Sequence, residues 1–345
     1  MSQASNSSPD PVGLRERPTV ITMPEIIRPP ALKAGDTVAI APLSSPLEAE
    51  VLKQYERGLE EVEELGFRVK ATPLVDVEKV WWWAAARPAE VARELNDLFL
   101  DPEVRAIWAL GGGRFTLSYL DMLDYDAIAA NPKPLIGMSD ISTLLLAIHS
   151  RTGLVAFHAD LLLYGPGEWN ELSDADHARQ AEVYRRVLTS TEPVGRMPAL
   201  SMWETWRRGR AEGQLLGGML NRLIRVQATP WALAPERFDG AILFFEDLGT
   251  STINIWHELQ ALRHSGVFDR IAGLLVGPTE TVEIAEGTTQ TLREVVLDVL
   301  GDRDIPVFGN VNLGHAGPNI PLPLGIRAAI DADALTVDLV EAAVS

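Results

Sequence analysis

The chain has 345 residues, of which 46% are hydrophobic and 23% are charged, as in ordinary globular proteins. One hydrophobic core rarely organises so long a chain, so we expect two domains. The net charge of -18 makes contact with nucleic acid unfavourable over most of the surface. Because the chain has no cysteine, a thiol nucleophile, a cysteine-bound zinc and disulfides are excluded.

The first 30 residues are polar and rich in Ser and Pro, which predicts a disordered leader over 1–30. This leader lacks the apolar core of a signal peptide behind a basic start. No later stretch reaches the roughly 18 uninterrupted apolar residues of a membrane span. The sequence therefore predicts a cytoplasmic protein without a membrane partner.

From residue 36 onward, short apolar runs alternate with stretches of helical spacing. The predicted strands are 36–42, 67–73, 104–110 and 133–137, with 154–160 as a further candidate, and the predicted helices are 48–65, 88–100 and 141–150. Alternation of this kind is typical of a parallel sheet with helices on both faces. We therefore expect a Rossmann- or flavodoxin-like α/β domain over residues 31–165.

The periodicity weakens between residues 166 and 208, which we interpret as a connector that contains one helix near 176–188. Strands are predicted again at 240–247, 271–278, 305–310, 325–331 and 334–340, and helices at 253–266 and 291–301. We interpret residues 209–345 as a smaller C-terminal α/β domain.

Ser139 lies between a predicted strand and a predicted helix, in Gly137-Met138-Ser139-Asp140. This is the context of a nucleophile elbow, in which a sharp turn exposes the hydroxyl at the carboxyl edge of a sheet. The helix start would also direct backbone N–H groups toward an anion forming beside Ser139. A simple helix-cap role for Ser139 or Asp140 explains the same residues. The motif lacks the last glycine of G-x-S-x-G, so both interpretations stay open.

Three consecutive glycines, Gly111 to Gly113, follow the predicted strand at 104–110 and allow the backbone to approach a ligand closely. They do not form a dinucleotide fingerprint, because Thr116 stands where a glycine is required, and the lysine of a P-loop is missing. A tight turn without a ligand explains these glycines equally well.

Glu246 ends a predicted strand, and His315 lies in a glycine-flanked loop. An acidic residue at a strand end is commonly a solvated loop starter, and His158 is a rival base near Ser139. No H-x-x-x-H or H-E-x-x-H spacing occurs, so we expect no metal site, and we expect no cofactor.

Several ordered blocks together resemble one family, the LD-carboxypeptidases and the related microcin C self-immunity peptidases. The blocks are 32–46, 110–113, 123–158, 213–223, 240–249 and 309–331. The resemblance implies a Ser-His-Glu triad made of Ser139, His315 and Glu246. It also implies an oxyanion hole formed by the backbone N–H groups of Gly113 and Asp140, beside Gly112. A homodimer is a further expectation that comes from the resemblance.

The same resemblance implies a serine carboxypeptidase, with two competing substrates. One is a peptidyl- or aspartyl-nucleotide, as for the immunity type, and the other is a murein tetrapeptide that loses its terminal D-alanine. The candidate substrate-binding residues are Arg114, Asn221, Trp203 and Trp206, the two tryptophans because immunity-type members stack a nucleobase on a tryptophan in this region. A non-catalytic peptide-binding protein on the same scaffold is the alternative from another class.

The chain also departs from the family pattern, at positions that concern the substrate. Met138 replaces a tyrosine next to the serine, and Met219 replaces a frequent asparagine. Ala159 and Asp160 stand where Gly-Pro often follows the histidine at 158. These departures predict either an altered pocket or neutral drift.

Overall fold

The structure is a computed structural model that describes residues 23–345. A six-stranded sheet lies at the centre of its N-terminal half. Its order is β14-β5-β4-β3-β1-β2. The strands are β1 (Thr37–Ala41), β2 (Arg68–Ala71), β3 (Val104–Ala109), β4 (Leu135–Gly137), β5 (Phe157–His158) and β14 (Leu322–Pro323). All pairs are parallel except β14 with β5. The 2-1-3-4-5 order of the parallel strands is the flavodoxin-like one, which confirms the predicted fold class.

Helices cover this sheet, because each has apolar residues on at least one of its faces, which can pack against the strands. Those that follow its strands are α1 (Leu52–Glu64), α2 (Pro88–Leu100), α3 (Tyr125–Ala130) and α4 (Ile141–Thr152). In α2, Pro88 stands at the helix start, where its missing N–H costs nothing, and Val91, Leu95 and Phe99 are buried. Helix α4 buries almost every side chain, because it lies between the sheet and the C-terminal half, where it contacts α6 (Leu220–Gln227).

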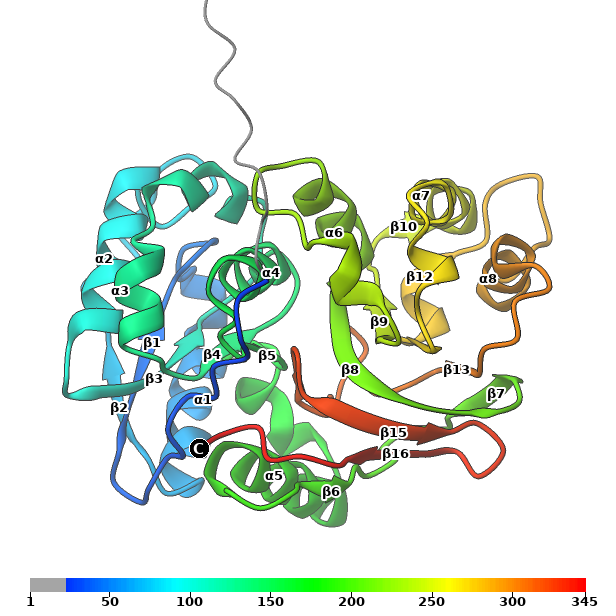
Figure 1. The fold of residues 1–345 in the computed structure, drawn as a ribbon. Helices are drawn as coiled ribbons and strands as arrows, with labels where there is room; N and C mark the ends of the chain where they lie inside the picture. Colours follow the sequence, from blue (N-terminus) through cyan, green and yellow to red (C-terminus); the bar gives the residue numbers. More distant parts are fainter. Residues whose placement is uncertain (1–22) are drawn as a thin grey trace, which may run out of the picture.

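The C-terminal half contains an eight-stranded mixed sheet with the order β6-β16-β15-β8-β9-β11-β13-β7. The strands are β6 (Gly195–Arg196), β7 (Glu204–Arg207), β8 (Arg210–Met219), β9 (Ile242–Glu246), β11 (Gly273–Val276), β13 (Val307–Gly309), β15 (Arg327–Asp331) and β16 (Thr336–Leu339). The central strands β8, β9, β11 and β13 run parallel, and antiparallel strands flank them. Helices α6, α7 (Thr252–His264) and α8 (Leu292–Leu300) lie along one face of this sheet (Figure 1).

Smaller elements complete the described chain. Strands β10 (Thr250–Ser251) and β12 (Val282–Glu283) form a separate two-stranded sheet, and α5 (Asp174–Thr189) precedes β6. Short 3-10 turns occur at Ala49–Val51, Thr116–Ser118, Leu120–Met122, Pro166–Glu171, Pro235–Phe238, Val267–Asp269 and Thr279–Thr281. No helix within residues 23–345 has both the length and the apolar character needed to cross a membrane.

Each of the two main sheets includes strands from outside its own half as predicted from the sequence. Residues 166–208, predicted as a connector, contain α5 as well as β6 and β7, both of which extend the C-terminal sheet. Strand β14 returns to the N-terminal sheet, where Leu322 pairs with His158. Both halves therefore depend on pieces from elsewhere in the chain.

Part of the predicted leader is packed against the rest of the chain. Ile27 forms a bridge with Leu154, and the backbone of Pro29 accepts a hydrogen bond from Ser345 N–H at 2.9 Å. The prediction of a disordered leader up to residue 30 is therefore wrong for residues 23–30. Its remaining part, residues 1–22, lies outside the described residues.

Candidate active site

The nucleophile candidate stands on a strained turn between β4 and α4. Ser139 has a φ of +60°, in the left-handed region of the backbone that residues other than glycine rarely adopt. The Ser142 N–H donates to the Ser139 carbonyl at 3.0 Å, so the first helical turn begins immediately after it. The Asp140 side chain makes no capping hydrogen bond with α4. A cap role therefore does not explain Asp140, whereas the backbone strain at Ser139 fits an elbow.

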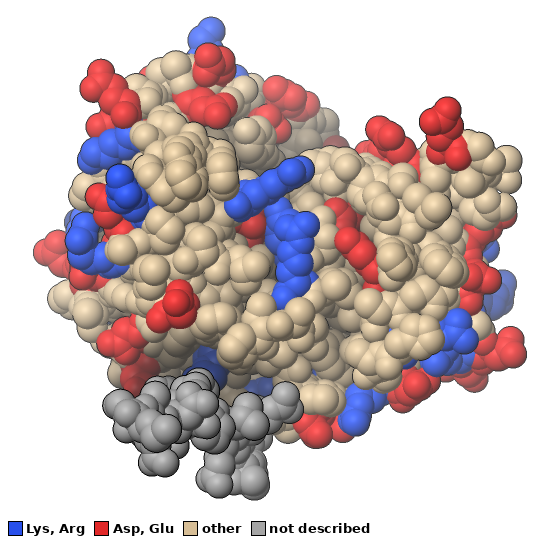
Figure 2. Space-filling view, turned by 90° about the horizontal axis from the view of Figure 1, so that it is seen from above, with Lys and Arg blue, Asp and Glu red and all other residues tan. Residues whose placement is uncertain are grey.

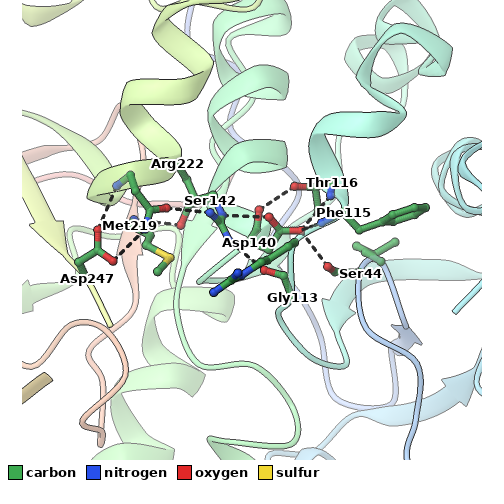
Figure 3. A network of polar contacts seen from close by, with 12 residues as sticks. Ser44, Gly113, Phe115, Thr116, Asp140, Ser142, Met219, Arg222 and Asp247 are labelled. Atoms are coloured by element: carbon green, nitrogen blue, oxygen red, sulfur yellow. Dashed lines mark hydrogen bonds and ion pairs between the residues drawn. The ribbon is translucent and has the colours of Figure 1, made fainter. Parts of the chain in front are cut away.

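The carboxylate of Asp140 is a buried junction of several chain segments (Figure 3). Its Oδ2 accepts hydrogen bonds from Ser44 Oγ at 2.8 Å and from the backbone N–H groups of Phe115 at 2.6 Å and Thr116 at 2.8 Å. Its Oδ1 lies 2.9 Å from Arg222 Nε, as a buried ion pair. Asp140 thus connects the chain after β1 and after β3 to Arg222 of the C-terminal half.

The glycine run after β3 lies directly against Ser139. A methyl group added at Gly112 would come within 2.7 Å of Ser139 Oγ, so only glycine allows this approach. The Gly113 carbonyl accepts a hydrogen bond from Arg222 Nη2 at 2.9 Å. The backbone N–H groups of Gly113 and Asp140 donate no hydrogen bond to another residue of 23–345. These N–H groups are thus available to a ligand.

His315 and Glu246 are hydrogen-bonded although they are far apart in sequence. The distance from His315 Nδ1 to Glu246 Oε2 is 2.7 Å. Glu246 ends β9 and is 2% exposed, and His315 lies on the loop between β13 and β14. Gly314, at φ +109°, makes room for the carboxylate, because a methyl group there would come within 2.6 Å of Glu246 Oε2. The glycine before His315 is therefore a steric requirement.

The pKa of His315 is raised above its usual value near 6.5. Burial acts most strongly and lowers this pKa, but the charge and hydrogen bond of Glu246, with a further contribution from Asp247, outweigh it. The imidazole thus accepts a proton more readily than a free histidine does.

Ser139 and His315 line two cavities that meet between them. The first, of about 630 Å³, is also lined by Gly112, Gly113 and Met138. The second, of about 430 Å³, is also lined by Gly113, Arg114, Met219 and Asn221. No hydrogen bond joins Ser139 to His315 among the described residues. Such contacts often tighten only when a substrate binds.

Two predicted substrate-binding residues do not reach this site. Trp203 is 6% and Trp206 is 5% exposed, and neither lines one of the two cavities. The Trp203 indole donates to Asn312 Oδ1 at 2.7 Å, and that of Trp206 donates to Glu204 Oε2 at 2.9 Å. The structure therefore contradicts their prediction as nucleobase-stacking residues, because burial of their rings in the C-terminal core leaves no face for a ligand.

The rival base His158 is 1% exposed and lines neither cavity. Burial lowers its pKa to about 4. Asn221 does line the second cavity, but its amide is already used, because Nδ2 donates to Asp247 at 2.9 Å and Oδ1 accepts from Arg222 at 2.8 Å. The amide of Asn221 therefore connects Arg222 to Asp247, the residue after Glu246.

Sequence reasoning missed a buried polar group beneath the His315 loop. Asp160, which lines the first cavity, accepts hydrogen bonds from Asn319 Nδ2 and, at 3.0 Å, from Gln180 Nε2. Asn319 Nδ2 also donates to the Gly314 carbonyl at 2.6 Å. Burial raises the pKa of Asp160 to about 6, against these hydrogen bonds. The departure from the family pattern at Asp160 was the only signal that the sequence offered.

No group of three or more potential His, Cys, Asp or Glu ligands occurs within residues 23–345. The site places a hydroxyl and an imidazole on one cavity wall, with the imidazole hydrogen-bonded to a carboxylate and backbone N–H groups nearby. These are the groups that nucleophilic catalysis by a serine requires.

Comparisons with known proteins agree on one family. Residues 38–159 match the LD-carboxypeptidase N-terminal domain, and residues 212–330 match the LD-carboxypeptidase C-terminal domain. The chain is 30% identical over 330 residues to the microcin C7 self-immunity protein MccF of Escherichia coli, which covers 90% of this chain and 94% of that protein. It is 31% identical over 319 residues to a probable murein peptide carboxypeptidase of Bacillus subtilis, which covers 92% and 95% of the two chains.

A solved structure of MccF in complex with aspartyl sulfamoyl adenosine has the same fold. Its TM-score is 0.81 at 27% identity, and the match covers 92% of this chain and 100% of that one. With both domains matched in order, the chain belongs to the LD-carboxypeptidase family of serine peptidases, alongside MccF-like members.

Proposed function

We propose that Ser139, His315 and Glu246 form the catalytic triad with which this serine peptidase cuts an amide bond. The observation that carries the proposal is the 2.7 Å hydrogen bond between His315 and Glu246, since it holds the imidazole in a cavity wall that Ser139 shares. The elbow at Ser139, with its φ of +60°, adds independent support.

In the proposed mechanism, Glu246 accepts a hydrogen bond from the Nδ1–H of His315, so that Nε2 carries no proton and can act as the base. Nε2 takes the proton of Ser139 Oγ while this oxygen attacks the scissile carbonyl. The C–N bond then breaks, and His315 returns the proton to the leaving amine, which leaves an ester on Ser139. A water molecule repeats the cycle and releases the acid.

The negative charge on the carbonyl oxygen needs donors that are already in place. We assign this role to the N–H groups of Gly113 and Asp140, which have no acceptor among the described residues. Loss of one such donor costs about 3 to 4 kcal/mol of transition-state stabilisation in comparable sites. Arg222 supports both residues, because it binds the Gly113 carbonyl and the Asp140 carboxylate.

For the substrate, we favour an aminoacyl- or peptidyl-nucleotide, with removal of D-alanine from a murein tetrapeptide as the second candidate. The likeness to MccF over 90% of the chain supports the first, and that to the Bacillus protein supports the second. The burial of Trp203 and Trp206 removes the argument from nucleobase stacking on these residues.

The test is to incubate the protein with a murein tetrapeptide and with an aspartyl-adenylate analogue side by side, and to identify the products by mass. We expect cleavage of the analogue by the wild type and none by Ser139→Ala. Full activity of that variant would refute the assignment, and exclusive cleavage of the tetrapeptide would replace the favoured substrate by the second.

A non-catalytic peptide-binding role accounts less well for the site, because binding alone does not require a hydrogen-bonded His315 and Glu246 beside Ser139. The homodimer implied by the family resemblance and the cytoplasmic location expected from the sequence remain predictions. Light scattering of the purified chain tests the first, and fractionation of cells tests the second.

A further inference from the structure

Asp160 is a carboxylate buried just after β5, next to the loop that carries His315. Several acidic side chains project from the surface on the face shown in Figure 2, whereas that of Asp160 is 1% exposed. Its Oδ2 accepts hydrogen bonds from Gln180 Nε2 at 3.0 Å and from Trp169 Nε1 at 3.4 Å. Its Oδ1 accepts from Asn319 Nδ2. Burial of a carboxylate is costly without such bonds, so these three neutral donors hold it in place.

The backbone before Asp160 is fixed relative to the turn that carries Ser139. His158 pairs with Gly137 in the sheet, and the Ala159 N–H donates to the Gly137 carbonyl at 3.1 Å. Asp160 and Ser139 each follow this pair of residues by two positions. The paired strand ends therefore hold Asp160 at a set place beside the proposed nucleophile.

The amide of Asn319 connects Asp160 to the loop of His315. Its Nδ2, which has two hydrogens, donates to Asp160 Oδ1 and, at 2.6 Å, to the carbonyl of Gly314. Because both neighbours are acceptors, the amide is oriented with Nδ2 toward them. Asn319 is 2% exposed, and Gly314 directly precedes His315. A single buried amide therefore joins the carboxylate at 160 to the backbone next to the imidazole.

The same amide also contacts the turn of the nucleophile. Its Nδ2 lies 3.7 Å from the Sδ of Met138, which directly precedes Ser139. Met138 and Asp160 are two of the positions at which the sequence departs from the family pattern, and both meet at Asn319. A common contact favours a shared role over independent drift.

We propose that Asp160 and Asn319 are positioning residues that set the distance between Ser139 and His315. The strand end fixes Asp160 relative to Ser139, and Asn319 carries that position to the Gly314 carbonyl and thereby to the imidazole. No hydrogen bond joins Ser139 to His315 among the described residues, so the approach of the two depends on how their loops are held. The inference rests on the proposed function, because the distance matters for activity only if both residues take part.

Asn319→Leu tests the link, because leucine has a similar volume and donates no hydrogen bond. The assay uses whichever candidate substrate the wild type cleaves, at pH 7.5, above the pKa of about 6 to which burial raises Asp160. We expect kcat and the rate of fluorophosphonate labelling of Ser139 to fall about tenfold to a hundredfold. KM should change less than about twofold, because the loss concerns the transition state. Unchanged kcat and labelling would overturn the inference.

Thr152→Val is the matched control for loss of a buried hydrogen bond. Thr152 lies at the opposite end of α4 from Ser139 and is 4% exposed. Its Oγ1 donates to the Ile148 carbonyl at 2.7 Å and accepts from the Leu154 N–H at 3.0 Å. Thermal melts should show both variants folded but less stable, whereas kcat should fall in Asn319→Leu alone. An equal fall of kcat in the control would mean that Asn319 only supports the fold.

A reversed pair separates the two contacts of the amide. In Asp160→Asn with Asn319→Asp, the new amide at position 160 can donate to the carboxylate at 319, but this carboxylate cannot donate to the Gly314 carbonyl. The double variant should be more stable than Asn319→Asp alone, which sets two carboxylates against each other, while its kcat should stay low. Recovery of kcat to the wild-type value would contradict a link through Gly314.

A measurement without turnover separates this inference from the proposed function. The Nδ1–H of His315, hydrogen-bonded to Glu246, should give a far-downfield proton resonance in nuclear magnetic resonance spectra that is absent from His315→Gln. Asn319→Leu should shift or broaden this resonance, and Thr152→Val should not. If it does so while the wild type cleaves no amide substrate, the proposed function fails and the link stands. If the wild type is active, and kcat and the resonance are unchanged in Asn319→Leu, the link fails alone.

Discussion

Arg222 of the C-terminal half forms a buried ion pair with Asp140, the residue directly after Ser139, with 2.9 Å between Nε and Oδ1. The same guanidinium donates to Asn221, whose amide binds Asp247 next to Glu246. One cation thus links the turn that carries the proposed nucleophile to the strand end that carries the carboxylate proposed to orient His315 (Figure 3). The relative position of Ser139 and Glu246 depends on this link.

Arg222→Met should destabilise the fold by about 3 to 5 kcal/mol, because it leaves the Asp140 carboxylate buried without its counter-ion. Urea unfolding followed by circular dichroism measures the change. The matched control is Arg303→Met, which removes a surface pair with the exposed Asp269 and should cost less than about 1 kcal/mol. Equal losses in the two variants would show that the Asp140 pair does not matter.

Glu246→Gln should slow amide hydrolysis about 10⁴-fold, because the imidazole loses the acceptor that sets its tautomer. The pH dependence should change as well. In the wild type, activity falls as pH drops through the raised pKa of His315, because protonation removes the base. Without the Glu246 charge this pKa decreases, so the acidic limb of kcat/KM should move to lower pH. An unmoved limb would show that Glu246 does not act on His315.

Gly112→Ala should lower kcat at least about a hundredfold, because the new methyl group displaces Ser139 Oγ from its position. Gly111→Ala is the control, since a methyl group there meets only Leu163 at an ordinary 3.6 Å. Steady-state kinetics on both variants, with thermal melts to verify folding, measure the difference. Similar kinetics of the two alanine variants would mean that the close approach at Gly112 has no catalytic consequence.

Trp203→Phe should reduce stability by about 1 kcal/mol, through loss of the indole hydrogen bond to Asn312, and leave the KM for a nucleotide substrate unchanged. Thermal denaturation and substrate titration measure the two effects. A KM raised more than about tenfold would restore Trp203 as a substrate contact.

The sequence predicts the N-terminal half well because its signals are local. The run Val104–Ala109 is a short apolar stretch before glycines, and Pro88–Leu100 has helical spacing after a proline, so each is recognisable without knowledge of its neighbours. Strand β8 was not predicted, because Gly213, Gly217 and Gly218 weaken its pattern, although they allow close packing against β9 and α4. Short pairings such as β14 with β5 have no local signal at all.

The proposed site also combines residues that have a local signal in the sequence with residues that have none. Ser139 and the glycine run have local motifs. Glu246 and His315 are only weak candidates from their positions, and the family resemblance assigns them to the triad. That α6 and α7 both line the second cavity beside Ser139 has no signal in the periodicity of the sequence. Trp203 and Trp206 show the reverse error, because a tryptophan in a weakly patterned segment proved to be core.

Whether Ser139 is the nucleophile is tested most directly by reaction of the protein with a fluorophosphonate, followed by peptide mapping by mass spectrometry. We expect a single adduct on Ser139, formed much more slowly in Glu246→Gln and absent in Ser139→Ala. An adduct on another residue, or unchanged labelling in Ser139→Ala, would contradict the claim that this hydroxyl is the nucleophile.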